Sequence, residues 1–480
     1  MEPMCRFCGI VLMLCMAESI PVEDGDQPRD LEHQVTSDAG GHILTNVNCW
    51  SPDGRWLVYD RRVAEDVFDG ERIERVNVDS GKVEVLYTSS DGAHCGVVTC
   101  SPVDNRVVFI VGPENPTEQW SYCARHRRGV VVDAAHPGRG ATLDARDLTN
   151  PYTPGALRGG THVHVFSGDG QWVSSTYEDA VLADAPPSAG ADLNQRNVAV
   201  SAPFGPVHVK QDHPRNHDGT HFTVLVTCTT NQPRAGSDEI SRAFSDAWVG
   251  TNGYLRVDGT RQKRAIAFQG DVVTTGGGTI SEVFIVDLPD DLAVVGQWPL
   301  EGTPSRRPAP PKGTVQRRLT HTDGRKHPGL QGPRHWLRSS PDGSRIAFLM
   351  KDDDGIVHIW TISPHGGDPI QVSHNRWSVQ SAFSWSPDGR FIAYAADNSI
   401  MVTQVDNGHS VRVTRRFPDS EAPTHLACVF APDGHRIAYM RPVVSPQGRF
   451  HQLFFVRLSD VASGSVFPRD HVLGSRTIPR

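Results

Sequence analysis

The stretch SWSPDGRFIAY, residues 384–394, decides the fold because it is one of six copies of a single pattern. The other five copies are CWSPDGRWLVY (49–59), TCSPVDNRVVF (99–109), VFSGDGQWVSS (165–175), RSSPDGSRIAF (338–348) and VFAPDGHRIAY (429–439). Ser-Pro-Asp-Gly has the composition of a tight turn, in which proline fixes φ and glycine follows the aspartate. The apolar run after the turn is typical of a short buried strand. Each copy therefore predicts a β-hairpin.

The spacing of the copies predicts a propeller. Their shared serine or alanine falls at positions 51, 101, 167, 340, 386 and 431, so the intervals are 50, 66, 173, 46 and 45 residues. Periods near 45 residues are typical of propellers, where one sheet cannot bury its faces but a ring of sheets can. The interval of 173 residues leaves room for one further blade, with an inner strand at 221–230 and later strands at 264–270, 282–288 and 316–322. We therefore predict an all-β, single seven-bladed β-propeller over residues 30–480, with six or eight blades as the alternatives.

Two segments fall outside the repeat. Residues 231–263 are predicted to be an insertion with one short helix near 237–248, where Ser237 would cap the first turn. The segment Gln34-Val35-Thr36 resembles the outer strands, which end in QVS, RVT or RLT. We expect it to complete the last blade and to close the ring, which removes open sheet edges. An extended N-terminal tail is the alternative.

The N-terminus and the net charge indicate where the protein works. Arg6 precedes an apolar run at 7–17, which is too short to cross a bilayer but has the length of a secretory signal core. We expect a signal peptide at 1–20 and a periplasmic or secreted protein with no integral membrane segment; without cleavage the protein would be cytoplasmic. The net charge of −8 argues against nucleic acid as a partner, because binding to phosphates requires basic surfaces.

The repeated WSPDG and IAY elements resemble the TolB-like propellers, also called WD40-like or PD40 repeats. Within that group the chain is most similar to the YidR-like proteins, often labelled "biopolymer transporter Tol". That likeness is carried by HILTNVNCWSPDG (42–54), IERVNV (73–78), PGALRGGTHVHVFSGDG (154–170), NQRNV (194–198) and GSDEI (236–240). More distantly, the chain resembles the oligogalacturonate lyases, which are single propellers that hold manganese through histidines and a glutamine. The G-x-S-x-G motif of propeller peptidases is absent from the sequence, which argues against serine hydrolysis.

Polar residues shortly before the turns are candidates to project into one mouth of the propeller axis. They are Asn46, Asn48, His94, His162, His164, His335, Gln380 and His425. The resemblance to the lyases implies a divalent metal such as manganese, held by His162, His335, Gln380 and His425. Neutral imidazoles are suitable ligands for such ions. The sequence departs from the lyase pattern, in which the glutamine and two histidines share one strand, and a wet channel without metal is the alternative.

A second group of candidates is basic. Arg125, Arg127 and Arg128 lie in one run, and Arg158 lies shortly before His162. Guanidinium groups bind carboxylates and phosphates in a bidentate manner. With His164, His94 and Asn46, these arginines are the predicted ligand-binding residues, and solvated surface charge is the alternative.

Two functions follow from these patterns. The first is a non-enzymatic TolB-like binding module that holds a protein or a saccharide at the axial mouth. The alternative is a metal-dependent lyase that acts on acidic oligosaccharides, in which the metal would acidify the proton beside the substrate carboxylate. Fold alone does not separate them, because propellers carry many functions.

Overall fold

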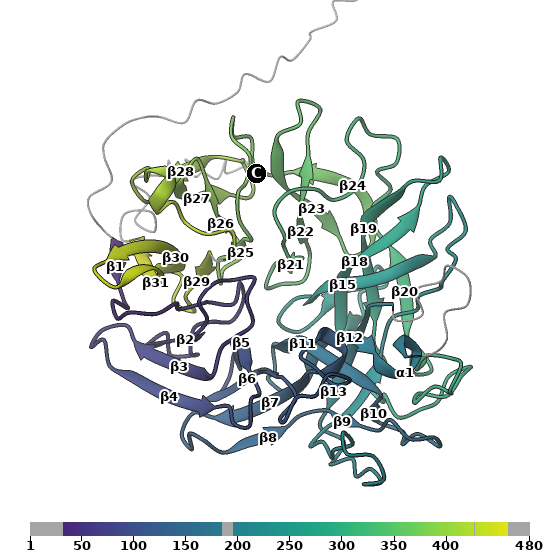
Figure 1. Ribbon diagram of the computed structural model, residues 1–480. Helices are drawn as coiled ribbons and strands as arrows, with labels where there is room; N and C mark the ends of the chain where they lie inside the picture. Colours follow the sequence, from purple (N-terminus) through teal and green to yellow (C-terminus); the bar gives the residue numbers. More distant parts are fainter. Residues whose placement is uncertain (1–31, 185–194, 427, 459–480) are drawn as a thin grey trace, which may run out of the picture.

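Seven sheets of three or four antiparallel strands are arranged in a ring about a central axis (Figure 1). The computed structural model describes residues 32–184, 195–426 and 428–458. The predicted all-β, seven-bladed propeller is confirmed. The signal peptide predicted at 1–20 lies outside the described residues.

The blades follow the order of the chain, and in blades 2 to 7 the inner strand is named first. Blade 1 contains β2 (Trp56–Asp60), β3 (Arg72–Asn77) and β4 (Val83–Thr88); blade 2 contains β5 (Cys95–Cys100), β6 (Arg106–Val111), β7 (Arg128–Asp133) and β8 (Gly140–Thr142). Blade 3 contains β11 (Gly159–Phe166), β12 (Val173–Asp179), β13 (Asn197–Ala202) and β14 (Phe222–Leu225); blade 4 contains β15 (Ile240–Trp248), β18 (Ala265–Val273), β19 (Thr279–Asp287) and β20 (Val315–Arg318). In blade 1 the inner position is taken by the segment 43–50, which forms isolated bridges to β2.

The remaining blades are equally regular. Blade 5 contains β21 (Arg338–Ser339), β22 (Ile346–Lys351), β23 (Val357–Ser363) and β24 (Gly366–Gln371); blade 6 contains β25 (Ser384–Trp385), β26 (Phe391–Ala396), β27 (Ser399–Gln404) and β28 (Ser410–Arg412). Blade 7 contains β29 (Val429–Phe430), β30 (Arg436–Ser445), β31 (Gly448–Arg457) and β1 (Glu32–Gln34). Short elements between the blades are β9 (Ala145–Arg146), β10 (Ala156–Leu157) and η2 (Asp419–Glu421); within blades 2, 3 and 4 the strands are connected through η1 (Ala124–His126), α1 (Ala180–Ala183), and β16 (Tyr254–Leu255) with β17 (Arg261–Gln262). No helix among the described residues is long and apolar enough to cross a membrane.

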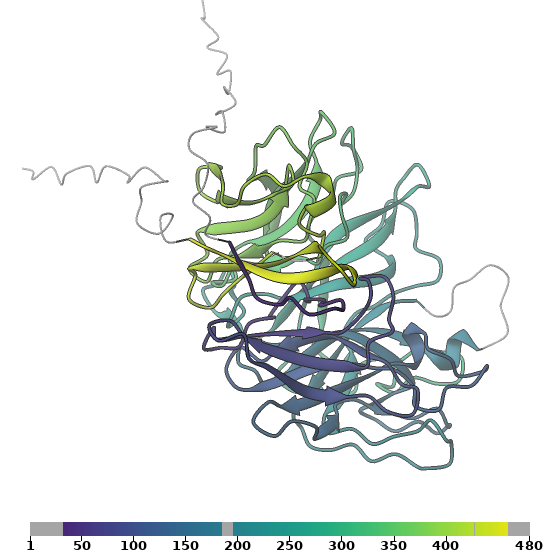
Figure 2. The ribbon, with the colours of Figure 1, turned by 60° about the vertical axis from the view of Figure 1, so that its left-hand side comes forward.

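The first and last parts of the described chain meet in blade 7. β1 pairs antiparallel with β31, with Glu32 opposite Val456 and Gln34 opposite Phe454. Figure 2 shows this last blade beside blade 1. An apolar cluster that includes Leu57 of blade 1 and Phe455 of blade 7 fills the space between the two blades, so the ring is packed at this point.

The repeated turns form as their composition predicts. In the copy at 384–394, the Ser386 hydroxyl donates to Asp388 Oδ1 at 2.6 Å and accepts from the Phe391 N–H at 2.9 Å. Gly389 follows with φ of 71°, a left-handed conformation that favours glycine. The turn thus places β25 and β26 side by side as the first hairpin of the blade.

Two predictions for blade 4 are wrong. The segment 221–230, predicted as its inner strand, instead contains β14, the outermost strand of blade 3. The helix predicted near 237–248 is strand β15, the inner strand of blade 4, so the segment 231–263 carries part of the blade itself. The cause is a pair of register shifts in β15, between Ile240 and Ala243 and between Phe244 and Ala247. Each shift adds a residue to the strand, which turns the alternation of a strand into spacings of three and four that imitate a helix.

Candidate functional site

Several inner strands are bulged at the same level of the axis. Val97 in β5, Val163 in β11 and Ser245 in β15 have φ of 60°, 56° and 55°, and the strand register shifts at each of them. A β-branched residue with a positive φ is strained, by roughly 1–3 kcal/mol. Such strain persists only where the surrounding structure imposes it, and it is common beside functional sites.

The bulges accompany an apolar cluster that we call the waist. It contains Val163, Val165 and Trp336, with Val47, Val97 and Trp248 packed against them. These residues come from the inner strands and adjoining segments of blades 1 to 5. In sequence they lie between, or at the borders of, the residues that line two cavities, and these two cavities share no lining residue.

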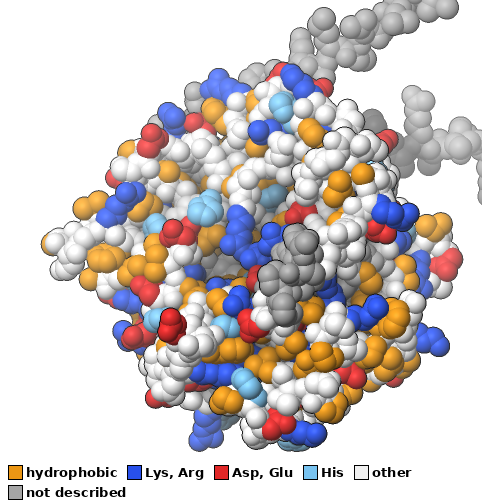
Figure 3. Space-filling model, turned by 45° about the vertical axis from the view of Figure 1, so that its right-hand side comes forward, with side chains coloured by type: hydrophobic (Ala, Val, Ile, Leu, Met, Phe, Trp, Pro, Cys, Tyr) orange, Lys and Arg blue, Asp and Glu red, His pale blue; other side chains and the backbone are white. Residues whose placement is uncertain are grey.

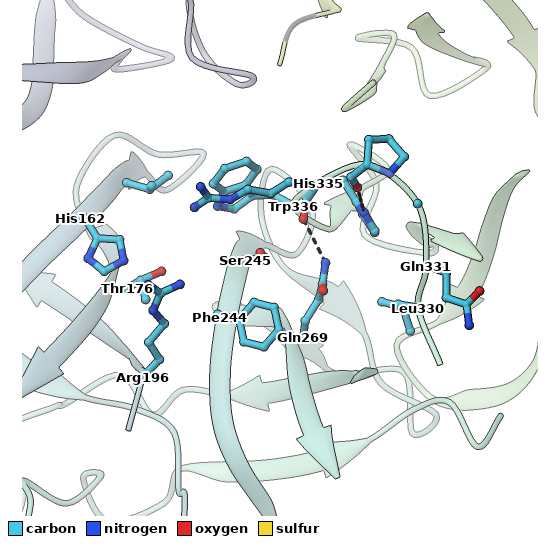
Figure 4. A pocket seen from close by; sticks show the side chains of 14 residues that line it. His162, Thr176, Arg196, Phe244, Ser245, Gln269, Leu330, Gln331, His335 and Trp336 are labelled. Atoms are coloured by element: carbon cyan, nitrogen blue, oxygen red, sulfur yellow. Dashed lines mark hydrogen bonds between the residues drawn. The ribbon is translucent and has the colours of Figure 1, made fainter. Parts of the chain in front are cut away.

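The first cavity, which we call the basic mouth, has a volume of about 290 Å³. Blades 3 and 4 and the segment before blade 5 line it (Figure 4). Its polar side chains are His162, Thr176, Arg196, Ser245, Gln269, Gln331, Arg334 and His335. In Figure 4 the Gln269 side chain points to the backbone of His335, to whose carbonyl oxygen it donates at 3.0 Å.

Two arginines, Arg196 and Arg334, line the basic mouth, and the charge of a third, Arg127, acts on Arg334 and His162 from nearby. Burial lowers the pKa of Arg334, and the neighbouring Arg196 and Arg127 lower it further. Arg196 donates to the Glu178 carboxylate at 2.7 Å, whereas neither Arg127 nor Arg334 has a carboxylate within ion-pair distance among the described residues. Figure 3 shows basic side chains gathered beside a hollow near the centre of the face that it presents. The arrangement is that of an anion-binding site.

Arg127 and Arg334 are held by aromatic rings. The guanidinium carbon of Arg127 lies 5.2 Å from the ring centre of Phe68 and 4.7 Å from that of Tyr122. That of Arg334 lies 4.7 Å from the ring centre of Trp336. Cation–π contacts of this kind orient a guanidinium without neutralising its charge. The charge therefore remains available for a ligand.

His162 lies beside these arginines as a neutral imidazole. Burial is the main cause that lowers its pKa well below the ordinary value, and Arg127, Arg196 and Arg334 lower it further. Its Nδ1 atom is buried and has no hydrogen-bond partner among the described residues. Figure 4 shows the ring at the edge of the cavity. An unpartnered buried nitrogen is costly, so a ligand that satisfied it would gain affinity.

The structure does not bring the four predicted metal ligands together. His335 uses both ring nitrogens within its own blade, because Nδ1 bonds to the Pro333 carbonyl oxygen at 3.0 Å and Nε2 accepts from the Leu349 N–H at 3.2 Å. The exposed Gln380 accepts from the Asn398 N–H, and His425 pairs with Glu65 at 3.1 Å. Within residues 32–184, 195–426 and 428–458, no three His, Cys, Asp or Glu side chains are placed to hold an ion. The donors present do not fit the manganese implied by the lyase resemblance, and guanidinium groups beside His162 would repel a cation.

The predicted basic residues separate into two groups. Arg127 does not line the basic mouth, but it lies near enough for its charge to lower the pKa of His162. Arg128 forms an ion pair with Glu114, and Arg125 lies 3.7 Å from Asp184. Arg158, expected to bind ligand, is buried and donates to Asp179 and to the Thr303 and Arg306 carbonyls. This arginine therefore connects the end of blade 3 to the 303–306 segment, and its guanidinium is fully committed to the protein.

The remaining predicted ligand-binding residues, His164, Asn46 and His94, contact other parts of the protein and lie outside the wall of the basic mouth. His164 is fully buried and bonds to the Thr161 hydroxyl at 3.0 Å. Asn46 Oδ1 accepts from Arg338 at 2.5 Å. His94 packs edge-on against Tyr122, with ring centres 6.3 Å apart. None of the three lines the basic mouth.

Sequence reasoning missed Arg196, Gln269 and Arg334. Arg196 opens the segment before β13 and Gln269 lies in β18, so neither belongs to an inner strand. Arg334 directly precedes the predicted His335, but the prediction rested on imidazoles and amides before the turn. An arginine beside one of those positions is the signal that points to Arg334.

Comparisons with known proteins agree with this fold. A family model described as "Protein of unknown function (DUF3748)" matches residues 94–217. The chain is 49% identical to "Uncharacterized protein YidR" of Escherichia coli (strain K12) over 411 residues, which are 85% of this chain and 94% of that protein. A solved structure of oligogalacturonate lyase in complex with manganese superposes with a TM-score of 0.52 at 13% identity, covering 92% of this chain and 98% of the other. Oligogalacturonate lyase from Vibrio parahaemolyticus gives a TM-score of 0.51 at 11% identity, covering 92% and 97%. At such identities the two lyases show similarity of fold alone.

Proposed function

We propose that this chain, which belongs to the family of the Escherichia coli protein YidR, binds an acidic saccharide through its carboxylate at the basic mouth. The observation that carries the proposal is the cluster of Arg127, Arg196 and Arg334, of which only Arg196 is paired with a carboxylate among the described residues. Without an anion the three guanidinium groups repel one another. A carboxylate removes that repulsion and accepts charge-assisted hydrogen bonds.

The size and lining of the basic mouth favour a small anionic ligand. Its volume of about 290 Å³ is at the lower end of the range for pockets that bind small molecules. Arg334 is the least constrained of the three arginines and would receive the carboxylate in a bidentate manner. Neutral His162 would bond to a hydroxyl through its unpartnered nitrogen. Thr176 and Ser245 supply further hydroxyls at the wall.

The proposal is one of binding without metal chemistry. The two lyases share the fold, yet the histidines that would hold manganese here point to different partners. We therefore assign no elimination step to this site. We further propose that residues 1–20 direct the protein to the periplasm, where acidic saccharides would reach it.

Titration calorimetry of the full chain with di- and trigalacturonate tests the proposal. We expect binding that weakens as salt is added, because the attraction is electrostatic. Arg334→Ala should weaken it at least ~10-fold, equivalent to about 1.4 kcal/mol, and Arg334→Lys by less, because a lysine keeps the charge but loses the bidentate geometry.

The matched control is Arg345→Ala. This variant removes an exposed arginine of blade 5 that pairs with Asp406 of blade 6. It should leave the affinity unchanged. Absence of binding, or equal affinity in the Arg334→Ala protein, would contradict the proposal, as would a preference for acidic peptides over uronates. Added manganese should have no effect on the affinity; a strong dependence would restore the metal hypothesis.

A further inference from the structure

One apolar ring lies among the polar side chains of the basic mouth. Phe244 of β15 lines this cavity and is partly exposed. It belongs neither to the apolar clusters on the two sides of blade 4 nor to the waist. Trp336, which also lines the cavity, is only 7% exposed and packs into the waist. Phe244 therefore keeps ring surface that the core does not cover.

The rings of the second cavity are used differently. That cavity has a volume of about 280 Å³, and its wall includes Trp248, Trp385 and Phe430. Trp385 and Phe430 are 8% and 7% exposed and belong to the apolar clusters between blades 5 and 6 and between blades 6 and 7. Trp248 packs against the waist. These rings hold blades together, whereas Phe244 does not.

A bulge in β15 directs Phe244 out of the core. Ser245 has φ of 55°, and the register with β18 shifts between Phe244 and Ala247. Before the bulge, Ala243 packs between blades 3 and 4; after it, Ala247 packs between blades 4 and 5. A bulge changes the direction of a side chain locally. Here the ring lies opposite Gln269, which lines the same cavity, so the backbone presents the ring to the mouth.

The ring lies next to groups that bind oxygen. Figure 4 shows the Phe244 side chain beside Gln269, at the wall of the cavity. The Gln269 amide is already engaged, because it donates to the His335 carbonyl oxygen at 3.0 Å. Arg196 and Arg334 line the same cavity. The basic mouth therefore offers a ligand both charged donors and one apolar face in a small volume.

A uronate matches this combination of groups. Its carboxylate is bonded directly to a carbon of the pyranose ring, so a carboxylate bound by Arg334 keeps the ring inside the cavity. One face of a pyranose ring carries C–H groups, which pack against the face of an aromatic side chain. Phosphate and sulfate have no apolar face, and an acidic peptide carries its carboxylate on a flexible chain. A cyclic uronate therefore uses more of this wall than those anions do.

We propose that Phe244 is the surface on which the pyranose ring of the bound uronate lies, so that the basic mouth selects cyclic uronates over other organic anions. The inference rests on the proposed function and adds to it the residue that recognises the ring. The volume of about 290 Å³ is small for a longer ligand. The recognised unit is therefore one uronate ring, either free or at the end of a chain.

Titration calorimetry of the full chain with galacturonate and galactonate tests the inference. Galactonate is an open-chain acid with a carboxylate and hydroxyls but no ring. We expect the unchanged protein to bind galacturonate ~10-fold more tightly, because only the ring buries apolar surface on Phe244. Phe244→Ala should weaken galacturonate binding ~10-fold and leave galactonate binding unchanged. Phe244→Tyr, which keeps an aromatic face, should retain the preference.

Phe204→Ala is the matched control, because Phe204 is an exposed phenylalanine that does not line the basic mouth. It should leave the affinity for both acids unchanged. Phe244→Ala should melt within about 2 °C of the unchanged protein, since its ring lies outside the clusters that hold blade 4 to its neighbours.

The outcomes distinguish this inference from the proposed function. If galacturonate does not bind the unchanged protein, both are overturned. If Arg334→Ala weakens galacturonate binding but Phe244→Ala does not, the proposed function stands and the role of Phe244 is wrong. Equal affinity for galacturonate and galactonate also overturns the inference, as does tighter binding of benzoate, which would indicate a site for aromatic acids. Loss of both acids together with a lower melting temperature in Phe244→Ala would show that the ring is structural.

Discussion

At the scale of the residue, one hydroxyl repeats the same two hydrogen bonds in four blades. Ser51, Ser167, Ser340 and Ser386 each donate to the aspartate two residues later and accept from the N–H five residues later. In blade 7 the equivalent residue is Ala431, and the Arg436 N–H there is left without a hydroxyl to bond. The hydroxyl is therefore useful to a turn but not essential to the fold.

We expect Ser386→Ala to lower the free energy of unfolding by about 1 kcal/mol, the usual contribution of such hydrogen bonds. Urea unfolding followed by circular dichroism measures the change. Ligand binding at the basic mouth should be unaffected, because Ser386 does not line that cavity. If the free energy of unfolding fell by more than about 3 kcal/mol, the hydroxyl would stabilise more of the blade than the turn alone.

At the scale of the element, β1 joins blade 7 through side chains as well as backbone. The Glu32 carboxylate accepts from Arg441 Nε at 3.0 Å and from the Tyr439 hydroxyl. Arg441 is largely buried, and its other carboxylate, Glu421, is 3.7 Å away. The strand is three residues long, so these contacts matter to its attachment.

We expect Glu32→Gln to lower the free energy of unfolding by about 1–2 kcal/mol, because Arg441 loses its closest charged partner. Chemical unfolding and hydrogen exchange at β31 measure the effect. Glu239→Gln, at an exposed pair with Arg234, is the matched control. Unchanged exchange at β31 would show that β1 contributes little to holding the last blade.

The elements also show what the sequence could predict. Five inner strands were found because proline, glycine or both mark the turn beside each, and these residues act through local backbone geometry. β15 was mistaken for a helix because its bulges place Ile240, Ala243 and Ala247 at helical spacing. The candidate site was predicted only in part. His162 and Arg127 were named, but the clustering with Arg196 and Arg334 depends on the contacts between blades, which no local pattern encodes.

At the scale of the whole molecule, a group of buried and half-buried histidines ties stability to pH. Burial lowers the pKa of His162, His164, His217, His221 and His335, to about 3 for His164 and about 4 for His221 and His335. Between pH 6.5 and 4 the unfolded chain therefore binds more protons than the folded protein. Stability from these groups is present above pH 6.5 and is lost as the pH falls towards 4.

We expect His335→Gln to reduce this loss by up to about 1.4 kcal/mol per pH unit between pH 6 and 4.5, because one proton fewer is taken up on unfolding. Glutamine can keep both the donor and the acceptor of the ring. Urea unfolding at pH 7.5, 6.5, 5.5 and 4.5 measures the slope, with the exposed His374→Gln as the matched control. Parallel curves for His335→Gln and the unchanged protein would contradict the assignment.

The waist has a consequence for how the basic mouth would receive a guest. Val163 and Trp336 border that cavity and belong to one apolar cluster with Val97 and Trp248. Four neighbouring blades therefore brace one wall together. A wall that is already shaped in this way loses little conformational entropy when a ligand is taken up.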